Sequence, residues 1–332
     1  MTFSAKGWIR AGTALTCLGL ATYAAGDEKL TTYDGVCDAS AGIALDAHHF
    51  VIADNNTDAL RVYSYSGGKA VQKPRDLSDF LGAGDGKEAD LEAGARIGNR
   101  LWWITSHGLN KDAERKEIRY RLFATKVSIA RGAYRFKPIG EPYKQLMDMA
   151  LADPAYATSG LREAATKSPE KGGINIEGLA EGPDGGLYVG LRSPVGDRGA
   201  MIIPLLNPDK VIAGKPAELG APVFLDMQGS GIRSLEKIGK FYFVIAGPAA
   251  GKSDFSLYRW DGKAGGKLER IMVFSSDDDL KPEAIFAMIG SDDLYVLSDD
   301  GDHIAAMNGD KKCEKLDPSV KHFRGFKIKT PQ

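Results

Sequence analysis

The hydrophobic pattern of this chain is a series of short apolar runs separated by turns, and five of its segments share one plan. Each segment begins with a polar and a small residue, continues with an apolar run, turns, and ends in an apolar or aromatic run. Short apolar runs bounded by turn residues are typical of β-strands. The five segments begin at Cys37, Glu88, Ile174, Ile232 and Pro282.

The spacing of these segments defines a repeat. Aligned on their polar starting residues, they give Ser40, Glu92, Glu177, Arg233 and Glu283, with separations of 52, 85, 56 and 50 residues. The long interval contains residues 142–173, which are rich in Ala and Met at helix-like spacing and predict a helical insertion. Without about 30 inserted residues, the period is about 50 to 55 residues, which is long enough for four short strands.

Four short strands per repeat predict an all-β fold, a β-propeller with five four-stranded blades and one helical insertion. A β-helix would need a shorter repeat, and a β-sandwich would not need five similar units. A sixth blade, built from degenerate terminal sequence, stays open. The C-terminal run FRGFKIK is expected to be the outer strand of the last blade. Residues 27–332 would then form a single propeller domain.

The first 26 residues have the pattern of a signal peptide. Lys6 and Arg10 precede an apolar stretch at residues 11–25, and Ala24-Ala25-Gly26 offers a small-residue cleavage site. An uncleaved anchor is the alternative, although the stretch is short for a membrane span. We therefore expect a periplasmic or secreted protein.

The charge balance argues against a nucleic-acid partner. The chain has 43 Lys and Arg against 44 Asp and Glu, and loss of residues 1–26 would leave a net charge of −3. Nucleic-acid binding needs a basic surface that contacts phosphates. After the N-terminal stretch, no apolar run is long enough to span a membrane.

Two cysteines remain after cleavage, Cys37 near the mature N-terminus and Cys313 near the C-terminus. In an oxidising compartment they are candidates for a disulfide bond, and two unrelated buried thiols are the alternative. A disulfide would join the first and last blades and close the ring. A loop of this length would contribute roughly 5 kcal/mol in the chain-entropy treatment.

The propeller geometry gathers polar residues at one mouth of the central channel. The start of each inner strand and the end of the next strand lie on the same face of the disc. The inner strands would bring Asp38, Glu92, Glu177, Arg233 and Glu283 to this mouth. Crowded carboxylates need protonation, cations or a metal ion. We predict a divalent metal, calcium first, held by Glu92, Glu177, Glu283 and Asp38. Pairing with arginines, or direct acid–base work, are the alternatives.

Arg233 and three further residues are candidates for substrate chemistry at the same mouth. His107 follows an aromatic strand, and its ring is expected to reach the mouth as a general base, with a surface hydrogen-bonding role as the alternative. Arg192 and Arg233 suit bidentate recognition of a carboxylate, phosphate or sulfate. Asn110 lies in the turn after His107 and is a further candidate for substrate binding.

Several segments resemble a family of exported bacterial proteins that is catalogued as a domain of unknown function. The resemblance rests on GVCDASAGIAL, EADLEAGARIGNRLWWITSHGLNK, RLFAT and IEGLAEGPDGGLYVGLRSP and covers nearly all of the mature chain. More distantly, IEGLAEGPDGGLYVG is similar to a blade motif of esterase-like phytase domains and of regucalcin and gluconolactonase propellers. That similarity implies a metal-assisted hydrolase site in which Glu177 matches a metal ligand. The asparagine ligands of the lactonase group have no clear counterparts here.

Together these features predict an exported propeller that is a metal-dependent hydrolase of a small anionic ester, phosphoester or lactone. Glu177 and His107 would be its catalytic residues. The alternative is a non-catalytic periplasmic binding or scaffold propeller that recognises a glycan, a peptide or a protein partner.

Overall fold

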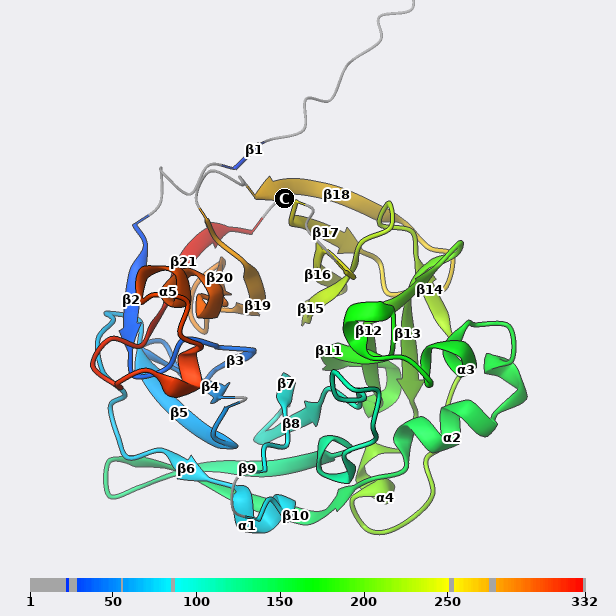
Figure 1. The fold of residues 1–332 in the computed structure, drawn as a ribbon, viewed down its shortest axis with the longest axis horizontal. Helices are drawn as coiled ribbons and strands as arrows, with labels where there is room; N and C mark the ends of the chain where they lie inside the picture. The colour runs from blue at the N-terminus through cyan, green and yellow to red at the C-terminus, as the bar shows by residue number, and fades with distance from the viewer. Residues whose placement is uncertain are drawn as a thin grey trace, which may run out of the picture.

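Five antiparallel sheets of short strands form a ring around a central axis (Figure 1). The computed structural model describes residues 22–23, 29–54, 56–84, 87–250, 254–274 and 279–330. Four of the sheets have four strands, and the other has a fifth strand, β1, added at its outer edge. This arrangement confirms the prediction of an all-β propeller with five blades.

The first two blades follow the predicted repeat closely. Blade 1 contains β3 (Ala41–Ala44), β4 (His49–Asp54), β5 (Ala59–Ser64) and β6 (Arg75–Asp76). Blade 2 contains β7 (Leu91–Ile97), β8 (Arg100–Thr105), β9 (Leu122–Ala130) and β10 (Ala133–Tyr143). In both blades the strands run from the inside of the ring to its rim in sequence order.

Blades 3 and 4 have the same order. Blade 3 contains β11 (Asn175–Glu181), β12 (Leu187–Gly196), β13 (Gly199–Leu205) and β14 (Val223–Leu225). Blade 4 contains β15 (Gly231–Ile238), β16 (Phe241–Gly247), β17 (Ser256–Trp260) and β18 (Leu268–Phe274). The short strand β1 (Thr22–Tyr23) pairs in parallel with β18.

Blade 5 is built from both ends of the chain. It contains β19 (Pro282–Ala287), β20 (Asp293–Ser298), β21 (His322–Lys329) and β2 (Thr31–Asp34). The prediction that FRGFKIK forms the outer strand was wrong, because β2 pairs antiparallel with β21 and takes the outer place. This pairing covers the edge of β21, which would otherwise be exposed. The N-terminal sequence thus completes the fifth blade, and the described residues contain no sixth.

The Cys37–Cys313 disulfide is present, with 6.1 Å between the two Cα atoms. Cys37 follows β2, and Cys313 lies in a 3₁₀ turn, Cys313–Lys315, that precedes β21. Both sulfurs are buried with Ile304. The disulfide therefore fastens the same blade that the β2–β21 pairing closes, as expected for a bond that joins the two ends of the ring.

The predicted signal peptide lies outside the described residues except for Thr22–Tyr23. Among the described residues, no helix is both long enough and apolar enough to cross a membrane. A disulfide is characteristic of proteins that fold in an oxidising compartment. Export and cleavage after residue 26 remain predictions.

The predicted insertion contains short helices on the outside of blades 2 and 3 (Figure 1). Five α-helices are described in the molecule as a whole. They are α1 (Ser78–Leu81), α2 (Leu146–Ala152), α3 (Leu161–Ala164), α4 (Pro208–Val211) and α5 (Gly301–Met307). Leu146, Met147 and Leu161 of α2 and α3 are buried in the same apolar cluster as β8 and β12. The insertion thus extends the core between blades 2 and 3.

The core lies between neighbouring blades, and the five inner strands contact one another around the axis. The small residues of the repeat are needed where these strands approach. At Gly42 on β3, an added Cβ would lie 2.5 Å from the Phe286 ring of blade 5. The recurring polar–small pattern therefore reflects close packing around the axis as well as the chemistry at its mouth.

Candidate functional site

Four of the five predicted starting residues are the unpaired residues of β-bulges. The pairing of β7 with β8 skips Glu92, and that of β11 with β12 skips Glu177. The β15–β16 and β19–β20 pairs skip Arg233 and Glu283 in the same way. A bulge adds one residue to one strand and redirects its side chain. The four charges thus share one structural position in four blades, at the channel mouth.

Glu177 and Glu283 are neutralised by arginines. Glu177 accepts from Arg192 Nη1 at 2.9 Å and from Arg233 Nη1 at 3.1 Å. Its Oε1 also accepts a 2.7 Å hydrogen bond from the Asn175 amide. Arg233 Nη2 forms an ion pair with Glu283. These four charged residues, Glu177, Arg192, Arg233 and Glu283, form the arginine side of the mouth.

The two arginines differ in exposure. The Arg233 side chain is 7% exposed and lies between two carboxylates, whereas the Arg192 side chain is 26% exposed. Arg192 Nε donates to the Pro248 carbonyl at 3.2 Å and its Nη1 to Glu177, so among the described residues its Nη2 edge is left for another acceptor. Arg233 is therefore placed to hold the ring together, and Arg192 to meet a ligand.

The opposite part of the mouth, towards blades 1 and 2, is rich in carboxyl groups. Burial first, and then Asp299, raise the pKa of Asp38 to about 8, against a 2.6 Å hydrogen bond from Asn56. Burial and the neighbouring acids raise the pKa of Asp58 to about 7 and also raise that of Glu88. We call Asp38, Asp58, Glu88, Asp90 and Glu92 the acid side.

Glu92 links the acid side to the arginine side. Loss of water raises its pKa well above the usual range, and the charges of Asp90 and Glu177 add to this effect. Arg233 and Arg192 act in the opposite direction. The Glu92 carboxyl is thus held in its neutral form more readily than an ordinary glutamate, and in that form it can donate a hydrogen bond.

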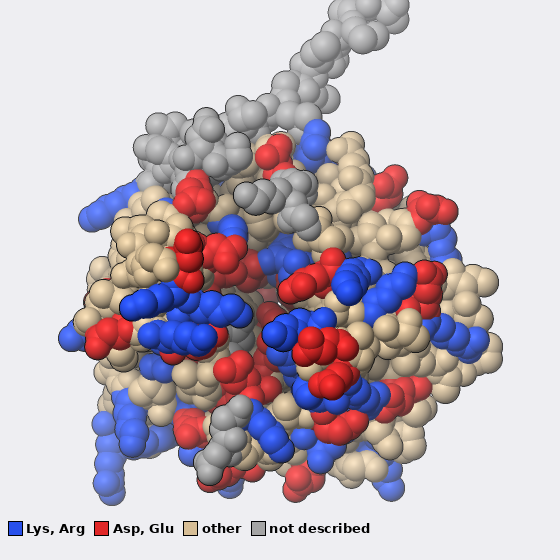
Figure 2. Space-filling view, viewed as in Figure 1, with Lys and Arg blue, Asp and Glu red and all other residues tan. Residues whose placement is uncertain are grey.

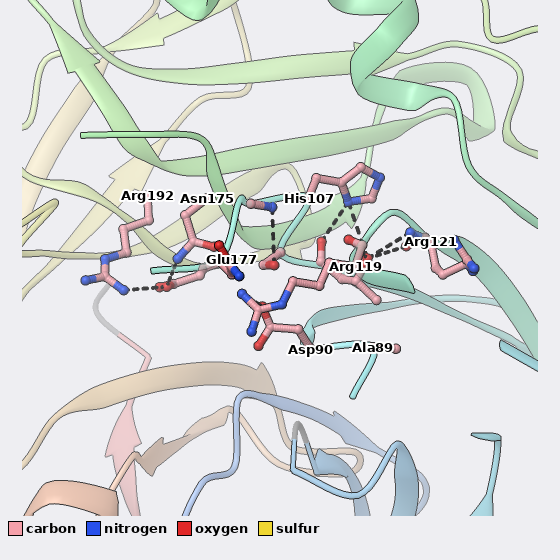
Figure 3. Close-up of polar contacts among 12 residues, drawn as sticks. Ala89, Asp90, His107, Arg119, Arg121, Asn175, Glu177 and Arg192 are labelled. Carbon is pink, nitrogen blue, oxygen red and sulfur yellow. Dashed lines mark hydrogen bonds and ion pairs between the residues drawn. The ribbon is translucent and has the colours of Figure 1, made fainter. Parts of the chain in front are cut away.

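A further cation at the mouth, Arg119, escaped the sequence analysis as a site residue. It follows the loop after β8, and its guanidinium lies 3.3 Å from the Asp90 carboxylate. In Figure 3 the Arg119 side chain extends toward Asp90 and the Glu177 group. Asp90 itself has φ of 67°, a left-handed backbone that Asp tolerates better than most residues. The only sequence signal for Arg119 was its place in a run of basic residues.

Below these charges the channel is nearly filled by side chains. A cavity of about 10 Å³ is lined by Ser40, Gly94, Glu177, Ser234 and Ile285, among others, and has room for about one water molecule. From above, charged side chains of both signs crowd around a hollow at the centre of the disc (Figure 2). A ligand at this site would therefore sit at the mouth and not inside the channel.

The His107 side chain does not point toward the charged residues at the channel mouth. Its ring is buried against Tyr120, and Figure 3 shows it directed away from Glu177 and Arg192. Nδ1 lies 2.8 Å from the Thr105 carbonyl, which can only accept, so Nδ1 carries the proton. Burial lowers the pKa of His107 to about 4, so the ring is neutral near pH 7. The expectation that the ring reaches the mouth was wrong, and its catalytic role remains untested.

Asn110 organises its own loop. Its side-chain oxygen accepts from the backbone amides of Asp112 and Glu114, and its amide donates to the Glu114 carboxylate at 3.0 Å. It also borders a cavity of about 550 Å³ that Arg119 lines as well. These contacts give Asn110 a structural role in the loop, and substrate binding by Asn110 remains a prediction.

The proposed calcium ligands do not fit a metal site as they are arranged. Glu177 and Glu283 are turned toward guanidinium groups, and Asp38 lies with Asn56 and Asp299. Across the described part of the chain, no group of three or more His, Cys, Asp or Glu side chains is placed to hold a metal ion. Calcium needs six to eight oxygen ligands. The ion pairs instead favour neutralisation by arginine, one of the alternatives open from the sequence.

Comparison with known proteins gives a match to a family model over part of the chain, and no activity. Residues 141–288 match the sequence profile of "Protein of unknown function (DUF3616)". The resemblance to a family of unknown function is thereby confirmed. The matched segment contains the helical insertion, all of blades 3 and 4 and all of β19, and therefore Glu177, Arg192, Arg233 and Glu283. No curated protein matches the chain.

The solved structures that are similar to this chain share little sequence identity with it. An exo-β-1,3-galactanase from Clostridium thermocellum is 13% identical with a TM-score of 0.49, over 89% of this chain and 60% of that one. A GH43 β-1,3-galactosidase is 11% identical with a TM-score of 0.48, over 88% and 90%. Virginiamycin B lyase from Staphylococcus aureus is 9% identical with a TM-score of 0.37, over 90% and 99%. Scores of this size carry no functional argument.

Proposed function

We propose that this protein is an exported binding propeller whose channel mouth takes a small organic acid that also carries amine or hydroxyl groups. The observation that supports this most directly is the half-buried guanidinium of Arg192, which is held over Glu177 and whose Nη2 edge is open within the described part of the chain. A guanidinium fixed in this way is well suited to a carboxylate or a phosphate. The acid side next to it would accept hydrogen bonds from the rest of the molecule.

Ligand titration by calorimetry tests this proposal. The panel includes acetate and inorganic phosphate as simple anions, simple amines, and molecules with both groups, such as amino acids and sugar phosphates. We expect the bifunctional molecules to bind best and Arg192→Met to weaken their binding at least tenfold. Arg162→Met removes an exposed arginine on α3 and is the matched control. Equal binding by the wild type and Arg192→Met would rule out this site.

A hydrolase acting on a small anionic ester, phosphoester or lactone is the second candidate. It is favoured by the placement of two carboxyl groups in unlike surroundings. Glu92 is half-buried beside other acids, whereas Glu177 is held by two arginines. Pairs of carboxyl groups whose surroundings differ in this way are a frequent basis of acid–base catalysis. Glu92 would protonate the leaving group while Arg192 holds the anionic part.

Two measurements separate the candidates. Turnover of a generic ester or phosphoester that is lost in Glu92→Gln, while ligand binding persists, would establish the enzyme. Binding without turnover on the same panel would establish the binding propeller. Elemental analysis of the purified protein decides the calcium prediction, and we expect less than one metal ion per chain because Glu177 and Glu283 are already paired with arginines. Stoichiometric calcium would require the arginine side to rearrange.

A further inference from the structure

The rim of blade 2 carries a row of cations across neighbouring strands. Lys126 on β9 lies directly opposite Arg100 on β8 and opposite Lys137 on β10. Directly opposed residues share one face of a sheet, and like charges at such positions repel each other. Arg100 is paired with Asp209 of α4. Among the described residues, neither Lys126 nor Lys137 has a carboxylate within ion-pair distance.

Three more exposed cations extend this row. Arg135 lies two residues before Lys137 and so on the same face of β10. Lys73 and Arg75 reach β10 from the neighbouring edge of blade 1. In the described part of the molecule none of these three has an ion-pair partner, and Asp76 is the one acid that lines the same cavity. We call the five exposed cations Lys73, Arg75, Lys126, Arg135 and Lys137 the blade 2 rim.

The blade 2 rim is hollowed on both sides of β10. One cavity of about 480 Å³ lies between residues 72–76 and residues 134–138. A second, of about 440 Å³, includes Arg100 and Lys126 and shares Lys137 and Pro138 with the first. Figure 1 shows β10 along the outside of the disc, beside β6. The cations thus line two adjoining hollows on the outer edge of the propeller.

Exposed apolar side chains accompany these charges. Val71, next to the first cavity, is 47% exposed, and Ile129 on β9 is 66% exposed. Ile129 lies opposite Tyr134 of β10, so these two side chains are on the other face of the hairpin from Lys126 and Lys137. Tyr134 and Lys137 both line the first cavity, so a segment docked along the β10 edge would reach both faces. A polyanionic glycan has no apolar side chains to cover these two residues, whereas a protein segment does. An apolar contact surrounded by a polar rim is the usual arrangement of a protein interface, in which Arg is enriched.

A partner would not extend the sheet of blade 2. The Gln72 side chain donates to the Tyr134 carbonyl at 3.0 Å and accepts from its amide at 2.9 Å, so this part of the β10 edge is occupied. Pro138, further along, has no amide hydrogen. Contacts with a partner would therefore be made by side chains.

We propose that the blade 2 rim is a docking surface for an acidic segment of another protein that also carries apolar side chains. Its carboxylates would neutralise Lys126, Lys137 and Arg135, whose mutual repulsion the free protein leaves uncompensated. Its apolar side chains would cover Val71 and Ile129. This surface lies on the rim, away from the channel mouth, and is independent of any ligand there.

The test uses fluorescence anisotropy with defined probes on the full mature protein. The first probe is a labelled peptide of alternating Glu and Leu, and the second is a peptide of alternating Lys and Leu. A polyuronate of similar charge represents a glycan. We expect the Glu–Leu peptide to bind, and to bind at least tenfold more weakly in 0.5 M than in 0.05 M salt. The Lys–Leu peptide should not bind.

Variants locate the site. The double variant Lys126→Glu/Lys137→Glu should weaken peptide binding at least tenfold, and Ile129→Ser severalfold. Lys215→Glu/Lys263→Glu changes two exposed lysines on other blades and should have no effect. Equal binding by all variants would overturn the proposal. So would a polyuronate that binds as tightly as the peptide and is insensitive to Ile129→Ser, or self-association that explains the signal.

A melting experiment distinguishes docking from a structural role. Because Lys126 faces Lys137, Lys126→Glu replaces a repulsion with an attraction, and the melting temperature should be unchanged or slightly higher. A variant that is as stable as the wild type and yet binds less peptide supports docking. A fall of several degrees in the melting temperature would instead show that the row of cations stabilises the fold and would count against the proposal.

Discussion

The two sides of the channel mouth neutralise the same kind of charge in different ways. On the arginine side, Glu177 and Glu283 are held by Arg233, and Glu177 also by Arg192. On the acid side, Asp38 and Glu92 have raised pKa values, because burial and neighbouring acids favour their neutral forms. The carboxylates of the arginine side are thus neutralised by ion pairs, whereas the carboxyl groups of the acid side are neutralised by protonation.

This difference indicates which part of the mouth is structural and which part can respond to a ligand. A buried carboxylate between two guanidinium groups has little freedom to change partners. A carboxyl group with a raised pKa can release its proton when a cation or a hydrogen-bond donor arrives. Arg192 is the more exposed of the two arginines, and its charge opposes the rise in the pKa of Glu92 on the acid side.

Loss of Arg233 should have the largest effect on the arginine side. Arg233→Met would leave Glu283 without its cation and remove one of the two that hold Glu177. Breaking a buried ion pair by removal of one partner typically costs about 3 to 5 kcal/mol. We expect a loss of that size in the free energy of unfolding, measured by urea denaturation at pH 7.

The double variant Arg233→Met/Glu283→Gln is the matched control for this prediction. It removes the orphaned carboxylate together with its cation and should recover part of the lost stability. If the single variant were as stable as the wild type, the arginine side would not depend on this pairing. Protonation would then be sufficient on both sides of the mouth.

The position of the inner charged residues within the repeat could be predicted from the sequence, but their place in β-bulges could not. Glu92, Glu177, Arg233 and Glu283 recur at one position of the repeat, which places them at one mouth. That each of them occupies a bulge depends on the pairing register of two strands. Register is a property of the folded sheet, and the residue types around these positions give no clear signal for it.

Two other features show the same limit. The Cys37–Cys313 bond could be predicted because few cysteines remain and a ring needs closing. The sequence did not reveal that β2, and not β21, is the outer strand of blade 5, because β2 is too short and too polar to stand out as a strand. His107 was misplaced because its positive φ of 52°, two residues beyond the end of β8, turns the chain, and its ring is buried. Local backbone conformation of this kind cannot be read from periodicity.

The raised pKa values of the acid side should make the free energy of unfolding depend on pH. The folded-state pKa of Asp38 is about 8, raised from 3.8 by burial and by Asp299. The folded protein therefore favours the protonated form of Asp38. The stability that this carboxyl contributes is fully present below about pH 4 and is lost as the pH rises through 8. Asp38→Asn keeps a neutral side chain at every pH. We expect it to be more stable than the wild type at pH 9, by roughly 1 to 3 kcal/mol.

Urea unfolding at pH 5, 7 and 9 measures this difference. The advantage of Asp38→Asn over the wild type should grow with pH. Asp184→Asn changes an exposed acid in the turn between β11 and β12 and is the control, with no such trend. A wild type and an Asp38→Asn variant that lose stability in parallel would show that the Asp38 carboxyl is ionised in the folded protein and is neutralised by a cation.

Arg192 should give the smallest change in stability and the clearest change in binding. Its side chain is 26% exposed, so Glu177 can recover water when Arg192 is lost, and Arg233 and Asn175 still hold that carboxylate. We expect Arg192→Met to cost about 1 kcal/mol, in line with hydrogen bonds to charged groups that remain partly solvated. Calorimetric binding of the bifunctional acids should fall at least tenfold in the same variant. A stability loss as large as that of Arg233→Met would place Arg192 in the structural framework and remove the reason to regard it as the ligand contact.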